Sequence, residues 1–280
     1  MRNVILVPNK NKDVNLKKTN LIKDFFEKNN YNVIIAEDYK DRHGNYRYSA
    51  NVSDAKYVIA IGGDGTFLQA VNDFGYIKYT KFVGINLGTV GFLTTVEMDI
   101  FEKQLTDLIN ENFDTEEYEL LSVADQNDHF YEECLNDVVI GRNGFARVIE
   151  LEIYVDGKNL YRFSGDGVLI STAVGSTAYN LSLNGPIIHP LSKTIVINPI
   201  APHSIGIKPI VIPSNSKVDV KIIGSHKKND TDAILTCDGR NNDRILTPGE
   251  IISISKGKTI NVVVFKDFNY FNNLKEKLTK

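Results

Sequence analysis

Residues 57–66, Tyr57-Val58-Ile59-Ala60-Ile61-Gly62-Gly63-Asp64-Gly65-Thr66, decide the fold of this chain. The first five are apolar without interruption, which is the pattern of a parallel strand buried on both faces. The glycines end this strand abruptly, and we expect a helix to follow from Thr66 through Phe74. A buried strand that leads directly into a helix is the repeating step of an α/β domain.

The segments around this stretch continue the alternation of strand and helix. Further strands are predicted by apolar runs at Val4–Val7, Val33–Ala36 and Phe82–Asn86. Helices are predicted where apolar residues recur at helical spacing, first at Leu16, Leu21, Ile22, Phe25 and Phe26, then at Met98, Phe101, Leu105, Leu108 and Ile109. The polar stretch 37–54 shows no period and is expected to be a loop. The first part of the chain therefore predicts a doubly wound parallel sheet.

The character of the sequence changes near residues 112–119. From there the strand-like runs are short, β-branched and closely spaced, at 148–155, 168–171, 194–197, 217–223, 251–255 and 260–265. Asp156-Gly157 predicts a type I′ hairpin turn, and one short helix is expected around residues 176–183. These features predict an all-β, sandwich-like domain.

The two patterns divide the chain into two expected domains. Residues 1–115 form the α/β domain, and residues 116–265 form the all-β domain. The last residues, 267–280, look helical and charged, and we expect a tail from about residue 266 to return to the first domain.

Composition excludes several classes of protein. The chain has 280 residues, of which 42% are hydrophobic and 24% charged, as in a globular protein with a substantial core. Its net charge of −3 predicts no general attraction to nucleic acid or to an anionic membrane. No apolar stretch reaches the roughly 18 residues of a membrane span. Two cysteines are too few for a disulfide framework, which favours a reducing compartment. Because the first residues also do not resemble a leader segment, we expect a cytoplasmic protein.

Asp64 stands out because it is a carboxylate inside a glycine-rich turn. Glycines at the end of a parallel strand let backbone N–H groups approach phosphate oxygens, and the following helix N-terminus favours an anion. Asp64 could act there as a general base toward a hydroxyl, could bind Mg²⁺ on the phosphates, or could only cap the helix. A second glycine-rich segment, residues 86–93, follows the next strand, so we expect both turns at one edge of the sheet.

The all-β domain contains a second group of polar residues. Asn136-Asp137 follows one strand, and Gly165-Asp166-Gly167 opens another that ends in Ser171-Thr172. The segment Gly175-Ser176-Thr177-Ala178-Tyr179-Asn180-Leu181-Ser182 then offers hydroxyls, N–H donors and an aromatic face. Such a set suits a planar base and its ribose, or it could be a capped surface helix without a ligand.

Taken in order, these segments resemble the motifs of the NAD kinase family over about residues 57–205. The resemblance implies transfer of the ATP γ-phosphoryl group to the 2′-hydroxyl of the adenosine ribose of NAD, with Mg²⁺ on the phosphates. It implies that Asp64 is the catalytic base and that NAD is bound by Asp64, Gly65, Asn136, Asp137, Arg147, Asp166, Thr177, Ala178, Tyr179, Asn180, Leu181, Ser182 and Ala201. It implies as partners only the small molecules NAD and ATP, together with a homodimer or homotetramer.

The chain departs from the family pattern at places that face phosphate. Many relatives have Glu where this chain has Asp137, and they often carry cations near Gln69 and at the position of Ser164. The missing cations leave phosphate charge to be met by Arg147, Arg240 or a partner subunit.

Two alternatives to the NAD kinase interpretation remain open at the level of sequence. A lipid or sugar-phosphate kinase shares only the Gly62–Gly65 turn, and a dinucleotide sensor without activity would explain the missing cations. Single residues have simpler readings as well: the five histidines lack metal-ligand spacing, Cys134 is expected to be buried and inert, and Asp238-Gly239 is interpreted as a turn.

Overall fold

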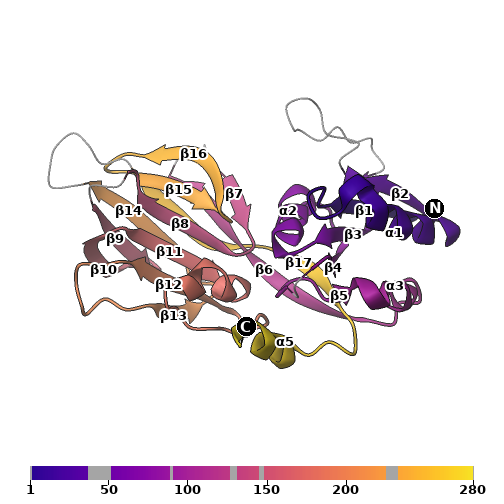
Figure 1. Cartoon of the computed structure of the whole chain (residues 1–280). Helices are drawn as coiled ribbons and strands as arrows, with labels where there is room; N and C mark the ends of the chain where they lie inside the picture. The colour runs from indigo at the N-terminus through magenta and orange to yellow at the C-terminus, as the bar shows by residue number, and fades with distance from the viewer. Residues whose placement is uncertain are drawn as a thin grey trace. The chain divides into compact units, whose positions relative to one another are not determined.

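The structure is a computed structural model that describes residues 2–36, 52–88, 91–126, 131–144, 148–224 and 233–279. The chain forms two compact units (Figure 1). Unit 1 contains Met1–Glu117 and Ile260–Lys280, and unit 2 contains Tyr118–Thr259. The segment expected as the loop 37–54 lies mostly outside the described residues. Among the described helices, none is long and apolar enough to cross a membrane.

Unit 1 is built on a parallel sheet in the order β2-β1-β3-β4, with β5 and the end of β17 also pairing with β4. Its strands are β1 (Arg2–Pro8), β2 (Tyr31–Ile35), β3 (Ala55–Gly62), β4 (Lys81–Asn86) and β5 (Val96–Glu97). Its helices are α1 (Lys17–Lys28), α2 (Asp64–Phe74), α3 (Phe101–Ile109) and α5 (Tyr270–Leu278), with short 3₁₀ turns at Val14–Leu16 and Met98–Ile100.

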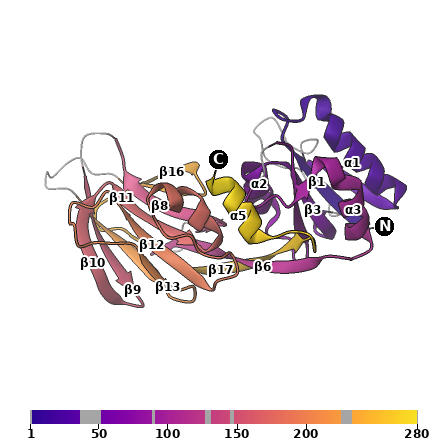
Figure 2. The same ribbon diagram turned by 60° about the horizontal axis from the view of Figure 1, so that its bottom comes forward.

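Helices cover both faces of this sheet (Figure 2). Ile22 and Phe26 of α1 and Leu105 and Leu108 of α3 share one buried cluster with alternate residues of the strands. Phe67 of α2 stacks edge-on against Phe82, whose neighbour along β4, Val83, belongs to that cluster. Because successive side chains of a strand point to opposite faces, α2 covers the other face. The expected doubly wound α/β fold is confirmed.

Unit 2 consists of two antiparallel β-layers. One is a six-stranded sheet in the order β13-β12-β11-β8-β15-β16, and the other contains β10-β9-β14-β17 with β6 and β7. The strands of the first are β8 (Asp137–Arg142), β11 (Gly167–Thr172), β12 (Thr194–Ile200), β13 (Ile210–Pro213), β15 (Ala233–Cys237) and β16 (Arg240–Leu246). Those of the second are β6 (Asp114–Asp125), β7 (Tyr131–Cys134), β9 (Ile149–Val155), β10 (Lys158–Gly165), β14 (Val218–Gly224) and β17 (Ile251–Val264).

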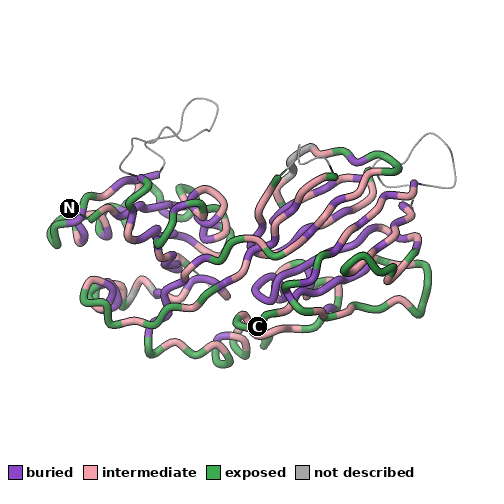
Figure 3. Tube along the Cα trace, turned by 180° about the vertical axis from the view of Figure 1, so that it is seen from behind, coloured by how far each residue is buried: buried purple, intermediate pink, exposed green. Residues whose placement is uncertain are grey.

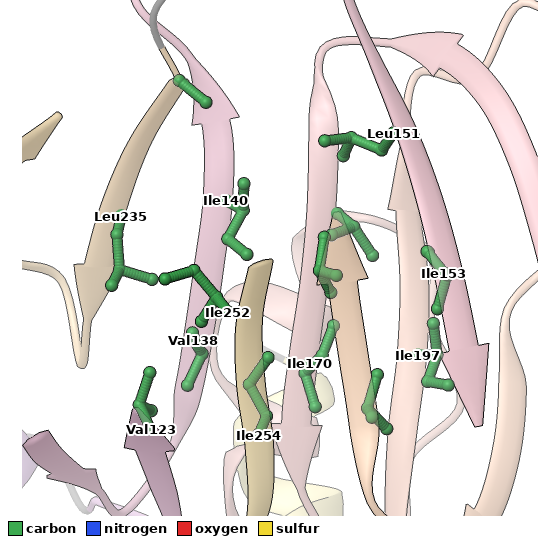
Figure 4. Close-up of a cluster of buried hydrophobic side chains, with 14 of the residues drawn as sticks. Val123, Val138, Ile140, Leu151, Ile153, Ile170, Ile197, Leu235, Ile252 and Ile254 are labelled. Atoms are coloured by element: carbon green, nitrogen blue, oxygen red, sulfur yellow. The ribbon is translucent and has the colours of Figure 1, made fainter. Parts of the chain in front are cut away.

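Aliphatic side chains from both layers fill the core of unit 2. Figure 4 shows Val138, Ile140 and Ile170 of the six-stranded sheet together with Leu151 and Ile252 of the other layer, and all five are essentially inaccessible to solvent. Purple, buried stretches alternate with pink and green ones along several of these strands in Figure 3. This alternation is expected for a sandwich whose outer faces meet water. The expected all-β domain is confirmed.

The structure differs from the sequence-based expectation at two elements. The runs 251–255 and 260–265 were expected as two strands, yet they belong to one strand, β17, whose first residues pair with β14 and whose last residues pair with β4. The expected helix at 176–183 is two short turns, Val174–Thr177 and α4 (Tyr179–Ser182), broken at Ala178. The Asp156-Gly157 turn has positive φ at both residues, 50° and 75°, as a type I′ hairpin requires.

Candidate functional site

The two glycine-rich turns of unit 1 lie side by side. β3 and β4 are parallel neighbours with Gly62 opposite Asn86, and the Leu87 N–H donates to the Gly62 carbonyl at 2.7 Å. Both turns therefore sit at the carboxyl edge of the sheet, where ligands of doubly wound folds bind.

Asp64 is the first residue of α2, and its carboxylate holds the second turn. Its Oδ2 accepts a hydrogen bond from the Phe92 N–H at 2.8 Å, and its Oδ1 accepts one from the Leu93 N–H at 3.0 Å. The residue at the helix cap is Gly63, and no side chain caps α2. The interpretation of Asp64 as a helix cap is therefore wrong, and the carboxylate is fixed in orientation by the neighbouring turn.

Gly91 makes this arrangement possible. A Cβ at this position would stand 1.9 Å from Asp64 Oδ1 and 2.5 Å from Thr94 Oγ1, so only glycine fits there without displacement. The carbonyl of Gly91 accepts a 2.8 Å hydrogen bond from the buried Asn273 side chain on α5. The turn that holds Asp64 is thus itself held by the C-terminal helix.

A pocket of about 400 Å³ opens beside Asp64. It is lined by residues of the first glycine-rich turn, of α2 and of the segment after β1, namely Val7, Pro8, Asn9, Lys12, Gly63, Asp64, Gly65, Thr66 and Gln69. The lining includes one carboxylate, Asp64, and one ammonium group, Lys12, together with the first residues of α2. A phosphate chain is the kind of ligand that this combination accepts.

Lys12 is a lining residue that the sequence analysis did not single out. A signal was available: the parallel strands of a doubly wound sheet end at one edge, so the residues directly after β1 must lie beside those after β3.

In unit 2, the Asn136-Asp137 pair lies at the start of β8 and is held by Asp238. The Asp238 carboxylate accepts hydrogen bonds from the backbone N–H groups of Leu135 at 2.9 Å, Asn136 at 2.7 Å and Asp137 at 3.3 Å. Asp238 and Gly239 both have positive φ, 53° and 68°, in the tight turn between β15 and β16. The interpretation as a turn is confirmed, but the side chain has a further role that sequence did not reveal.

Asp137 is a buried carboxyl group, with 5% of its surface exposed. Burial, and after it the nearby charge of Asp238, raise the pKa of Asp137 to about 7, although the hydrogen bond from the Tyr179 backbone N–H to the carboxylate lowers it in part. This contact also places the segment 177–182 next to Asp137.

The segment around Gly175 packs tightly on the Asn136 backbone. A Cβ on Gly175 would stand 2.0 Å from the Asn136 carbonyl oxygen, and the Thr172 hydroxyl donates to the Leu135 carbonyl at 2.6 Å. The structure therefore brings together eight of the residues predicted to bind NAD: Asn136, Asp137, Thr177, Ala178, Tyr179, Asn180, Leu181 and Ser182.

The side chains of the segment 177–182 differ in their exposure to solvent and in their hydrogen bonds within the protein. Tyr179 is 44% exposed, and Ser182 is also on the surface. Asn180 is fully buried: its amide donates to the carbonyls of Ser176 and Pro186 and accepts a hydrogen bond from Asn198. The Asn180 side chain thus holds the loop together from within.

Asp166 and Ala201 lie elsewhere in unit 2. Ser171 of β11 is paired with Asp137, whereas Gly167, directly after Asp166, is paired with Gly141. At about 3.3 Å per residue these two pairs are about 13 Å apart, so Asp166 stands at the opposite end of β11. Its carboxylate pairs with Arg142 at 3.0 Å.

Ala201 belongs to the Asp166 end of the sheet. A Cβ on Gly165 would stand 3.0 Å from the Ala201 carbonyl oxygen, and Ala201 has a φ of 42°, which non-glycine residues rarely adopt. Arg147 lies outside the described residues.

Arg240 is engaged within unit 2. Its guanidinium pairs with Glu132 at 3.1 Å and donates to the carbonyls of Cys237 and Glu133. These contacts hold its positive charge beside the turn that carries Asp238. Both cysteines are free thiols and buried, as expected for Cys134.

Comparison with known proteins agrees with this geometry. Residues 4–113 match the family model described as ATP-NAD kinase N-terminal domain, and residues 135–264 match that of the ATP-NAD kinase C-terminal domain. The NAD kinase of Lachnoclostridium phytofermentans is 33% identical over 291 residues, covering 99% of each chain. That of Clostridium perfringens is 33% identical over 288 residues, covering 100% of this chain and 99% of the relative.

Two solved structures share the whole fold. The crystal structure of yeast NADH kinase complexed with NADH has a TM-score of 0.84 at 24% identity and covers 100% of this chain and 88% of that one. An NAD kinase from Archaeoglobus fulgidus in complex with ATP has a TM-score of 0.77 at 25% identity, covering 100% and 99%.

A doubly wound domain with a Gly-Asp-Gly turn, joined to a β-sandwich, defines a class of phosphotransferases that act on alcohol groups. Within that class, the chain belongs to the NAD kinase family. Its activity is the ATP-dependent phosphorylation of NAD to NADP, which confirms the activity predicted from the sequence.

Proposed function

We propose that Asp64 is the catalytic base of this reaction. It accepts the proton of the ribose 2′-hydroxyl as that oxygen forms a bond to the γ-phosphorus of ATP, while the bond from this phosphorus to the β–γ bridging oxygen breaks and ADP leaves. The observation that supports this role is the fixed carboxylate at a pocket suited to phosphate. Phosphoryl transfer depends mainly on positioning, so a pre-oriented base is a large part of the protein's contribution.

The contacts of Asp64 leave it free to act as a base. An ionised carboxylate has about four acceptor positions, and the Phe92 and Leu93 N–H groups occupy one on each oxygen. The remaining positions are available to a hydroxyl. Gly65, the next residue, has no heavy atom within 4 Å of the place where a Cβ would stand, so substrate can approach its backbone there.

We further propose that Asn136, Asp137 and the segment from Thr177 to Ser182 bind NAD. Asp137 and the exposed Tyr179 ring supply an acceptor and an aromatic face, as ribose hydroxyls and a planar base require. Asn180 contributes by holding the loop, because its own amide is bonded within the protein.

Asp166, Ala201 and Arg147 are proposed to contact NAD as well, within a homodimer or homotetramer. Support for an assembly comes from unit 2, where Asp166 lies at one end of β11 and Asn136, Asp137 and the segment 177–182, here called the Asn136 group, lie at the other. A second copy that presents its Asp166 end to the Asn136 group of the first would combine both sets of contacts around one ligand. Light scattering combined with the activity of Asp166→Ala tests this part.

We propose Mg²⁺ as the metal that accompanies ATP. The pocket lining includes a single carboxylate, Asp64, and no group of three or more metal-binding side chains occurs among the described residues. A magnesium ion held mostly by phosphate oxygens and water, with Asp64 beside it, fits this set. Bound there, it would neutralise phosphate charge. We also propose a cytoplasmic location, for which the two buried free thiols are the support.

The test is NADP formation from NAD and Mg-ATP, measured with an NADP-specific dehydrogenase for the wild type, Asp64→Asn and a matched control. Asp24→Asn is the control, because Asp24 is exposed on α1 and carries the same charge. We expect Asp64→Asn to lower kcat by orders of magnitude with little change in the KM for NAD. The asparagine amide would also point an N–H donor at the Phe92 and Leu93 N–H groups, which lowers stability. Unfolding temperatures of the variants are therefore compared in parallel.

Three results would contradict the proposal. If Asp64→Asn had the same kcat as the control Asp24→Asn, Asp64 would not be the catalytic base. A wild type that binds NADP tightly without forming it would indicate a sensor, and turnover of a lipid in place of NAD would indicate a lipid kinase.

A further inference from the structure

The ATP triphosphate brings several negative charges to a pocket whose cation was not evident from the sequence. Of the two arginines considered, Arg240 is engaged by Glu132 and by two carbonyls of unit 2, and Arg147 lies outside the described residues. A cation of unit 1 that faces the glycine-rich turns would meet this charge.

The Lys12 ammonium lies over both turns. Its Nζ is 3.3 Å from the place where a Cβ on Gly63 would stand, and 3.9 Å from the corresponding place on Gly88. Gly63 directly precedes α2, and Gly88 follows β4. Because neither residue has a side chain, the ammonium faces the backbone of both turns, where phosphate oxygens would bind.

The backbone of Lys12 is held at this place by Asn9. The Asn9 N–H donates to the Ile61 carbonyl at 2.9 Å, and its side-chain amide donates to the Thr66 hydroxyl at 3.1 Å. Its Oδ1 and its carbonyl both accept the Lys12 N–H, at 3.2 Å and 3.0 Å. The segment after β1 is therefore fastened to the Gly62–Thr66 turn, and it carries Lys12 with it.

The Lys12 ammonium has no protein counter-ion among the described residues, since its Nζ forms no ion pair within 4.0 Å there. Other lysines of the chain pair with glutamates, as Lys256 does with Glu119 at 2.6 Å and Lys258 with Glu133 at 2.9 Å. Lys12 is exposed and faces the pocket that contains Asp64. A lysine in this position is available to an anionic ligand.

We propose that Lys12 binds the triphosphate of ATP and stabilises the charge on the phosphoryl group during transfer. This inference rests on the proposed function of the same pocket. Gln69 lines the same pocket, so Lys12 supplies from the segment after β1 the positive charge that relatives often carry near that position.

The test compares Lys12→Ala with Lys17→Ala, which removes the same charge from an exposed lysine nearby at the start of α1. Steady-state kinetics give the KM values for ATP and NAD separately, and calorimetry gives the Kd of ATP without turnover. We expect Lys12→Ala to weaken ATP binding or lower kcat by about 10- to 100-fold, the range of one charge-assisted contact. The KM for NAD should stay within about twofold, and Lys12→Arg should recover part of the loss because the charge returns.

The outcomes separate this inference from the function on which it rests. Equal ATP affinity and kcat in Lys12→Ala and Lys17→Ala, in a preparation whose wild type forms NADP, would overturn the role of Lys12 alone. A wild type that forms no NADP would overturn the proposed function, and the calorimetric Kd would then still decide whether Lys12 binds ATP. A loss confined to the KM for NAD would also count against Lys12 as a triphosphate ligand.

Discussion

Gly91→Ala should impair catalysis although residue 91 carries no reactive group. The new Cβ would stand 1.9 Å from Asp64 Oδ1, whereas ordinary contact begins near 3.4 Å, so the turn or the carboxylate must move by about 1.5 Å. That movement strains the two hydrogen bonds from Phe92 and Leu93 to Asp64. Misplacement of a catalytic group by about 1 Å costs about 100-fold in rate, and we expect a loss of kcat of about that size or more.

The same change should also lower stability. Hydrogen bonds to a charged group contribute about 1.5–3 kcal/mol each, and because Asp64 is only half-buried, water replaces part of this. We therefore expect the free energy of unfolding to fall by about 2–4 kcal/mol. Urea unfolding and the coupled NADP assay measure the two effects on one preparation.

Gly206→Ala is the matched control, because the place of its Cβ has no heavy atom within 4 Å and the residue is exposed. It should keep wild-type kinetics and stability. If Gly91→Ala matched this control in kcat and stability, the 91–93 turn would not be what fixes Asp64.

Three further predictions concern the supports of the site. Burial raises the pKa of Asp137 to about 7, so the folded state holds a proton that the unfolded state loses near pH 4, and stability should fall as pH rises from about 4 to about 7. Asp137→Asn should remove this contribution, of up to about 4 kcal/mol, in urea unfolding at pH 5 and pH 8; an unchanged pH profile would show that Asp137 is not the group responsible. Asp238→Asn should shift the same pH dependence of stability to lower pH, because it removes the charge that raises the pKa of Asp137. It should also raise the KM for NAD, because the backbone of residues 135–137 loses its hydrogen bonds to the Asp238 carboxylate. A KM for NAD equal to that of wild type would count against Asp238 as a support of this backbone. Asn273→Leu should lower kcat severalfold with the KM for NAD unchanged, because it removes the hydrogen bond from α5 to the Gly91 carbonyl. The control Asn272→Ala, on the exposed side of α5, should keep the wild-type kcat. Equal kcat in both variants would mean that α5 does not hold the turn that contacts Asp64.

The sequence alone determined the fold class and the family. The apolar run at Tyr57–Ile61 is typical of a strand buried on both faces, and the alternation of strand and helix around it leaves few topologies besides a doubly wound sheet. The ordered motifs from Gly62 to Pro186 were specific enough to predict the NAD kinase family. These are local properties, since each depends on residue types within one short window.

Only the tertiary structure decided which groups support the site. Asp64 meets Phe92 and Leu93 because parallel strands place their ends side by side, and Lys12 reaches the same edge from β1. Asp238 holds the Asn136 backbone across about a hundred residues of sequence, and Asn180 turned out to be bonded within its own loop. Periodicity and motifs carry no record of such contacts, because a hydrogen bond between distant segments depends on register and packing.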